Sequence, residues 1–161
     1  MQFSLEQAET QLAQTVRELA ESNRMSGRYG LTLTPEQMRS LAERRGEALR
    51  NTGRVEFGGG MLRDLIHAFC DSPNLIQTEY EAVLTELQDL FYEFKNETED
   101  RLSDEELLHA MRSVFDRTGG SLERLAETSP GDLERLARGK PAEEDEEEED
   151  GDADDKEDPD E

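Results

Sequence analysis

The chain has 161 residues and carries 41 acidic against 18 basic side chains, which gives a formal net charge of −23. This length fits a single domain, and the lone cysteine, Cys70, excludes an internal disulfide. No run of about 18 apolar residues is present to cross a membrane, and the first residues lack the pattern of a secretory signal, so we expect a cytoplasmic protein.

The first half of the chain predicts two long helices. Apolar residues recur at spacings of three and four from Leu5 to Leu19, which predicts an amphipathic helix over about Ser4 to Met25. Thr34, Pro35 and Gln37 then form a helix start in which Thr34 is the N-cap and Gln37 completes a capping box. This second helix is expected to end near Arg50.

Two short segments flank the second predicted helix and look extended. Residues Tyr29 to Leu33 alternate between apolar and polar side chains, and Arg54 to Phe57 has a similar pattern. We expect Gly30–Thr34 and Arg54–Phe57 to pair as a two-stranded β ribbon, which would need a helix packed on it to be stable.

The second half of the chain predicts further amphipathic helices. Met61 to Phe69 is a short, strongly apolar helix and is the best candidate for the centre of the core. Capping-box patterns begin at Thr78, before a helix to about Glu97, and at Ser103, before a helix that ends at Gly119. Two short helices complete the domain, over 121–127 and 130–138. The fold class is therefore all-α: about six amphipathic helices with a minor ribbon.

The last part of the chain is very acidic. Residues 141–161 contain 15 acidic side chains and one lysine, with almost no apolar side chains. Such a segment cannot bury enough surface to offset the entropy of ordering. We expect a helical domain over 1–139 and a disordered acidic tail over 140–161. The tail would either keep the protein soluble, or hold a basic partner, or screen a basic patch of the protein itself.

Three consecutive glycines precede the short apolar helix. Gly58, Gly59 and Gly60 indicate a sharp turn or a place where the backbone approaches another group closely. A helix N-terminus can also hold an anion, with Arg63 or Arg54 supplying charge. The stretch lacks the Lys-Ser/Thr pair of a phosphate-binding loop, so a structural turn is favoured and an anion site at Gly58–Arg63 is the alternative.

Other reactive side chains form no recognisable catalytic or cofactor motif. His67, Cys70 and Asp71 could lie on one helical face, but with only His109 as a further histidine they make a poor zinc site, and we predict no metal and no cofactor. Glu56 is a carboxylate between two apolar residues. We expect it to be buried and paired with Arg54, Arg63 or an arginine of the second helix rather than to act as a general base.

Arginines are concentrated between residues 24 and 54. Seven arginines stand there against three glutamates, in an otherwise acidic chain. The segment is either a solvated, ion-paired helix face, or a docking face for an acidic partner, or a patch that binds nucleic-acid phosphates. The arginines are not interleaved with aromatic residues, which disfavours the last of these.

Five strings occur in an order that resembles a family of proteins of unknown function: YGLTLTPEQ, GRVEFGGG, LIHAFCDSPN, ELQDLFYEFKNE and GSLERLAETS. The resemblance extends over about Leu12 to Arg138 and leaves out the acidic tail. It implies a small bacterial protein of the kind found in Firmicutes. The family has no assigned activity, so the resemblance carries no catalytic residues to this chain.

The sequence therefore favours a non-enzymatic protein-interaction module, an adaptor or a subunit of a larger assembly. The alternatives are a nucleic-acid-associated regulator that uses the Arg24–Arg54 segment, and a small enzyme or anion-binding protein at Gly58–Arg63. The predicted interaction surface combines the arginine-rich second helix with its neighbouring extended segments and consists of Tyr29, Arg39, Arg44, Arg45, Arg50, Arg54, Glu56 and Phe57.

Overall fold

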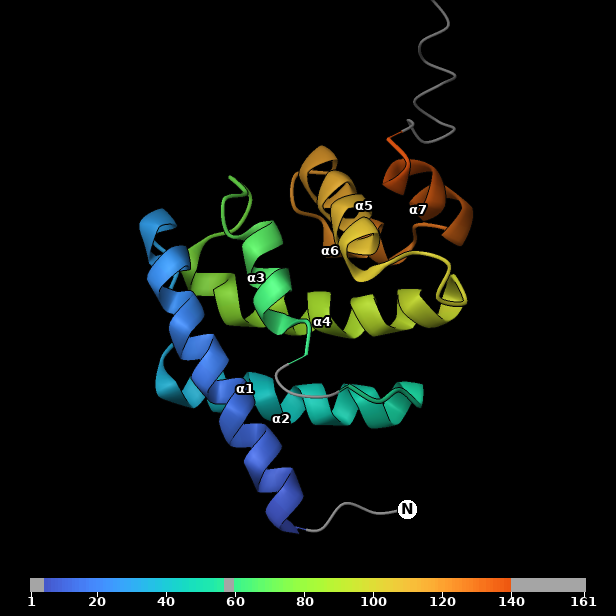
Figure 1. Cartoon of the computed structure of the whole chain (residues 1–161). Coiled ribbons are helices and arrows are strands. Elements are labelled where there is room, and N and C mark those ends of the chain that lie inside the picture. The colour runs from blue at the N-terminus through green and yellow to red at the C-terminus, as the bar shows by residue number, and fades with distance from the viewer. Residues whose placement is uncertain (1–4, 57–59, 140–161) are drawn as a thin grey trace, which may run out of the picture.

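The computed structural model of the protein describes residues 5–56 and 60–139, which fold as an all-α domain (Figure 1). The predicted all-α class is confirmed. The described residues form seven α-helices and two short 3-10 helices, with the bounds α1 Leu5–Ser26, η1 Gly27–Tyr29, α2 Pro35–Thr52, α3 Leu62–Phe69, η2 Gln77–Glu79, α4 Tyr80–Glu97, α5 Asp104–Arg117, α6 Leu122–Ala126 and α7 Pro130–Ala137. The predicted tail and Phe57, Gly58 and Gly59 lie outside the described residues.

Two of the three predicted capping boxes are present. Thr34 caps α2 together with Gln37, and Ser103 caps α5 together with Glu106, with both reciprocal hydrogen bonds formed in each case. The box predicted at Thr78 is wrong. The chain enters α4 through η2, where the Glu79 N–H donates to the Ile76 carbonyl, and no side chain caps the helix.

The predicted β ribbon is also wrong, because the described residues contain no strand. The segment 31–33 is extended, but side chains satisfy its backbone groups. The Asn23 side chain donates to the Leu33 carbonyl and accepts from the Leu33 N–H, at 2.9 Å each. The Gln77 side chain likewise donates to the carbonyl and accepts from the N–H of Thr32. Since each amide side chain imitates the peptide group of a neighbouring strand, residues 31–33 need no second strand.

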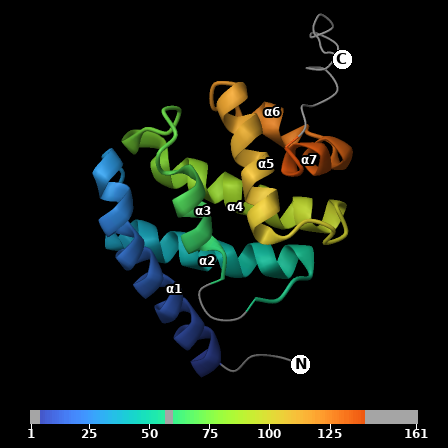
Figure 2. The same cartoon turned by 45° about the horizontal axis from the view of Figure 1, so that its top comes forward.

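Helices α2 and α4 lie side by side and run in the same direction (Figures 1 and 2). Two arginines of this region join them: Arg44 binds Asp89 at 2.6 Å, and Arg54 binds Asp100 at 2.6 Å. Helix α1 crosses α2 and also contacts α3, while α5 and α6 pack on another side of α4 and α7 packs against α5. Helix α4 is therefore the central element of the arrangement.

The short helix α3 lies in the core, as its composition predicts. Its buried side chains include Phe69, whose ring meets that of Phe115 edge-on at 5.4 Å between centroids. One apolar cluster extends from Leu19 in α1 to Leu136 in α7, so all seven helices of the described chain share a single core. Within the described residues, no helix is both long and apolar enough to traverse a bilayer.

The side-chain hydrogen bonds to residues 31–33 give a testable difference. Asn23→Ala should lower the free energy of unfolding by about 1–3 kcal/mol, because it leaves the partly buried N–H and C=O groups of Leu33 without their hydrogen-bond partners. Gln77→Ala is the matched control and should cost less, because its partners on Thr32 are exposed and can bind water instead. Urea denaturation of the two variants measures both values, and equal losses would contradict this account.

Candidate functional site

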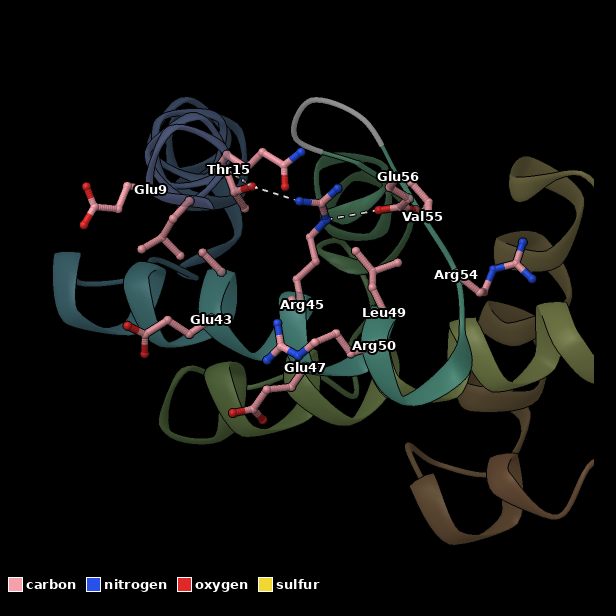
Figure 3. Close-up of a pocket in the computed structure, with 14 residues that line it drawn as sticks. Glu9, Thr15, Glu43, Arg45, Glu47, Leu49, Arg50, Arg54, Val55 and Glu56 are labelled. Atoms are coloured by element: carbon pink, nitrogen blue, oxygen red, sulfur yellow. Dashed lines mark hydrogen bonds and ion pairs between the residues drawn. The ribbon is translucent and has the colours of Figure 1, made fainter. Parts of the chain in front are cut away.

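A groove of about 490 Å³ lies between α1, α2 and the segment that follows α2 (Figure 3). Its apolar lining comes from Leu12 in α1, Ala42 and Leu49 in α2, and Val55 beyond α2. Val55 is 69% exposed, which makes it the most exposed of the large apolar side chains in the described chain. A concave apolar surface that ends in an exposed valine is suited to bind another apolar surface.

An ion pair between Arg45 and Glu56 forms the base of the groove. Arg45 projects from α2, is only 4% exposed, and donates from Nε to Glu56 Oε1 at 3.0 Å. Its Nη1 donates to the hydroxyl of Thr15 in α1 at 3.2 Å, and both bonds are drawn in Figure 3. The hydroxyl of Tyr92 in α4 donates to the same Glu56 oxygen at 2.6 Å. One network therefore joins α1, α2, α4 and the segment after α2.

The surroundings of Tyr92 keep its hydroxyl protonated. Burial, and then the charge of Glu56, raise the pKa of the Tyr92 hydroxyl well above its usual range, so the phenol stays protonated and remains a donor. Arg45 Nη2 is buried and has no hydrogen-bond partner among the described residues. The network holds the Arg45 and Glu56 charges as a pair between the helices.

Gly60 is the glycine that the ion pair requires. Its φ is +72°, and a Cβ atom there would lie within 2.6 Å of Arg45 Nε and Nη2 and even closer to Glu56 Oε1. The backbone thus passes directly against the guanidinium and the carboxylate. The sequence-based expectation that the glycine stretch marks a close approach is confirmed at Gly60, while Gly58 and Gly59 lie outside the described residues.

Most arginines of the predicted interaction surface take part in ion pairs within the chain. Arg39 pairs with Glu43 on α2, and Arg44 and Arg54 bind carboxylates of α4 and the turn after it. Arg45 is buried, so its prediction as a surface residue is wrong: the positive charge faces Glu56 rather than solvent. Of the alternatives predicted for Glu56, pairing with an arginine of the second helix is confirmed, while the expected burial of Glu56 is only partial.

The remaining residues of that predicted surface are not all brought together. Arg50 and Glu56 line the groove, whereas Tyr29 is exposed on η1 and does not line it. Phe57 lies outside the described residues. The structure therefore assembles a smaller site around Arg50, Val55 and Glu56 and leaves Tyr29 elsewhere.

The described residues of the predicted anion site, Gly60 and Arg63, have different surroundings. The backbone of Gly60 lies against the side chains of Arg45 and Glu56. Arg63 on α3 lines a second hollow of about 740 Å³ between α3 and α5. Both histidines of the chain, His67 and His109, line this second hollow. The structure does not join Gly60 and Arg63 into one anion-binding arrangement.

The described part of the chain contains no group of three or more His, Cys, Asp or Glu side chains that could hold a metal ion. Cys70 is buried, and this burial raises the pKa of its thiol, so the thiolate form is disfavoured. Asp71 binds Arg112 at 2.6 Å. His67, Cys70 and Asp71 thus have different surroundings although they are neighbours in sequence.

Sequence reasoning missed Thr15 and Tyr92, because neither shows in its local pattern that it would meet the ion pair. Arg45 did carry a signal. It stands seven residues after Met38, four after Leu41 and three after Ala42, so it occupies the buried stripe of α2. An arginine in that stripe requires a buried carboxylate, and Glu56 was the isolated acidic residue nearby.

Comparison with known proteins places the chain in a family. The sequence profile of a family of unknown function, DUF6323, matches residues 18–143, and the chain therefore belongs to this family. The match agrees with the resemblance inferred from the sequence. No curated protein and no solved structure matches the chain. The α1 wall of the groove, from Glu9 to Thr15, precedes the matched residues.

The close contact at Gly60 can be tested against a glycine of nearly identical conformation. Gly53 has φ +71° with nothing near its Cβ position, so Gly53→Ala should cost only the left-handed strain, about 1–2 kcal/mol. Gly60→Ala adds a collision with Arg45 and Glu56 and should cost clearly more. Chemical denaturation of both variants checks this difference, and similar losses would show that the ion pair is not held against Gly60.

The buried ion pair predicts a large effect of removing one charge. Glu56→Gln should destabilise the fold by about 3–5 kcal/mol, because it leaves the Arg45 charge buried without a counter-charge. Asp89→Asn is the matched acid-to-amide control. Its partner Arg44 is 44% exposed, so the loss should stay within about 1 kcal/mol. Thermal or urea unfolding that shows no difference would contradict the assignment of Arg45–Glu56 as the central pair.

Proposed function

We propose that this member of DUF6323 is a non-enzymatic protein-interaction module of the cytoplasm, which acts as an adaptor or subunit and binds its partner in the groove between α1 and α2. The observation that carries this proposal is Val55, which is 69% exposed beside the apolar lining of Leu12 and Leu49. Apolar side chains that stay in contact with water in the free protein gain free energy when a partner covers them.

The surroundings of the groove support a binding site that is formed before the partner arrives. Arg45 fixes α1 through Thr15 and fixes the segment after α2 through Glu56. The walls therefore lose little conformational freedom on binding, which favours affinity. Charged side chains such as Glu43, Glu47 and Arg50 surround the apolar lining, as in protein interfaces with an apolar centre and a polar rim.

The two alternative functions have less support. A nucleic-acid regulator would need arginines that are free to contact phosphates, whereas Arg39, Arg44 and Arg54 each bind a carboxylate of the same chain. An anion-binding protein or small enzyme at Gly58–Arg63 would need Gly60 and Arg63 to face one ligand, whereas Gly60 lies against Arg45 and Glu56 and Arg63 lines the hollow between α3 and α5.

Two exposed branched side chains provide a matched test. The chain with Val55→Asp should lose its protein partner when it is co-purified from its native host after nuclease treatment and a salt wash. Ile76→Asp is the control, because Ile76 is 51% exposed but does not line the groove, and this variant should retain the partner. Both variants should keep the wild-type melting temperature, since neither side chain is buried.

Mass spectrometry of the captured material decides the outcome. A stoichiometric protein that is present with wild type and Ile76→Asp but absent with Val55→Asp is the expected result. Equal capture by all three proteins, or capture of nucleic acid that salt removes, would contradict the groove as the binding site.

A further inference from the structure

We infer that the partner in this groove is a second copy of the same chain, which forms a two-fold symmetric dimer through α1 and α2. This inference rests on the proposed function and names the occupant of the same site. It follows from the charges on the two walls of the groove, from the position of α1, and from the distribution of negative charge along the molecule.

Most charges that line the groove are neutralised within the chain. Glu43 and Glu47 pair with arginines of α2, Arg54 pairs with Asp100, and Arg45 pairs with Glu56. Two lining charges then remain for which the described residues provide no ion-pair partner. They are Glu9 on the α1 wall and Arg50 on the α2 wall.

One unpaired acid and one unpaired base on opposite walls make the groove self-complementary. In a two-fold dimer, every contact between residue i and residue j of the partner occurs twice, with the roles exchanged. Glu9 of each copy can therefore meet Arg50 of the other, so that one interface satisfies all four charges. A surface of one charge sign would instead repel its own copy.

The position of α1 allows such an arrangement. Its first turns extend past α2 and away from the other helices, as Figures 1 and 2 show. This part of α1 forms one wall of its own groove and, in the proposed dimer, would lie against the groove of a second molecule. The contact would cover Leu12, Leu49 and Val55 of both copies, and so would bury the apolar lining together with the exposed valine.

The most acidic part of the sequence follows α7, the last helix of the domain. Residues 141–161 carry 15 acidic side chains and one lysine, and they follow α7. Helix α7 lies on the opposite side of the molecule from the first turns of α1 in both views.

Analytical ultracentrifugation of the full chain tests the inference. The wild type should sediment as a dimer that dissociates on dilution. Glu9→Arg and Arg50→Glu each create two like-charge contacts in the dimer and should raise its Kd by about tenfold or more. The double variant restores opposite charges and should recover the wild-type Kd, and an equimolar mixture of the two single variants should form heterodimers.

Glu21→Arg and Arg28→Glu are the matched controls, because both residues are exposed and neither lines the groove. They should leave the Kd unchanged. Circular dichroism and melting temperatures verify that every variant is folded, so a loss of dimer cannot be attributed to unfolding. Val55→Asp should weaken the dimer independently of Glu9 and Arg50.

Three results would overturn the inference. One is a wild-type chain that stays monomeric up to about 1 mM. Another is a dimer whose Kd is unaffected by either charge reversal, and the third is a loss that neither the double variant nor the mixture repairs. The dimer can fail while the proposed function stands. If the chain is monomeric and Val55→Asp abolishes capture of a different protein, the groove binds that protein and only the dimer is refuted.

Discussion

The fold depends on keeping one buried positive charge next to one partly buried negative charge. Arg45 cannot be left alone in the interior, because an unpaired buried ion costs several kcal/mol. Glu56 supplies the counter-charge from the segment that follows α2, and Tyr92 of α4 donates to the same carboxylate. Gly60 lets the backbone lie against both groups. The position of the segment after α2 is therefore fixed by charge and by backbone conformation together.

This constraint also shapes the groove. Because Arg45 reaches Thr15 as well as Glu56, the same guanidinium sets the distance between α1 and the segment that carries Val55. A buried ion pair contributes little net stability compared with apolar packing, but it admits few alternative arrangements of its neighbours. The apolar lining thus lies on a base held by hydrogen bonds, with α1 on one side and α2 on the other.

Local patterns predicted the helices well and the connections poorly. The apolar periodicities of α1, α3 and α4 and the capping boxes at Thr34 and Ser103 depend on residues a few positions apart, so they are readable in sequence. The β ribbon failed because Tyr29 ends the 3-10 helix η1, Gly30 is left-handed, and the backbone of Thr32 and Leu33 binds the amide side chains of Gln77 and Asn23. Nothing in the pattern of an extended segment distinguishes a partner strand from an amide that imitates one.

By itself, the sequence determined the all-α class, the acidic charge concentrated after residue 140, the helix starts, and the membership of a family without assigned activity. These properties follow from composition and from short-range periodicity. The tertiary structure alone decided that Arg45 is buried, that Gly60 faces the ion pair, and that Glu9, Arg50 and Val55 line the same groove. The physical reason is that burial and charge pairing are set by contacts between residues far apart in sequence, such as Tyr92 with Glu56 and Arg54 with Asp100, and local periodicity carries no information about such contacts.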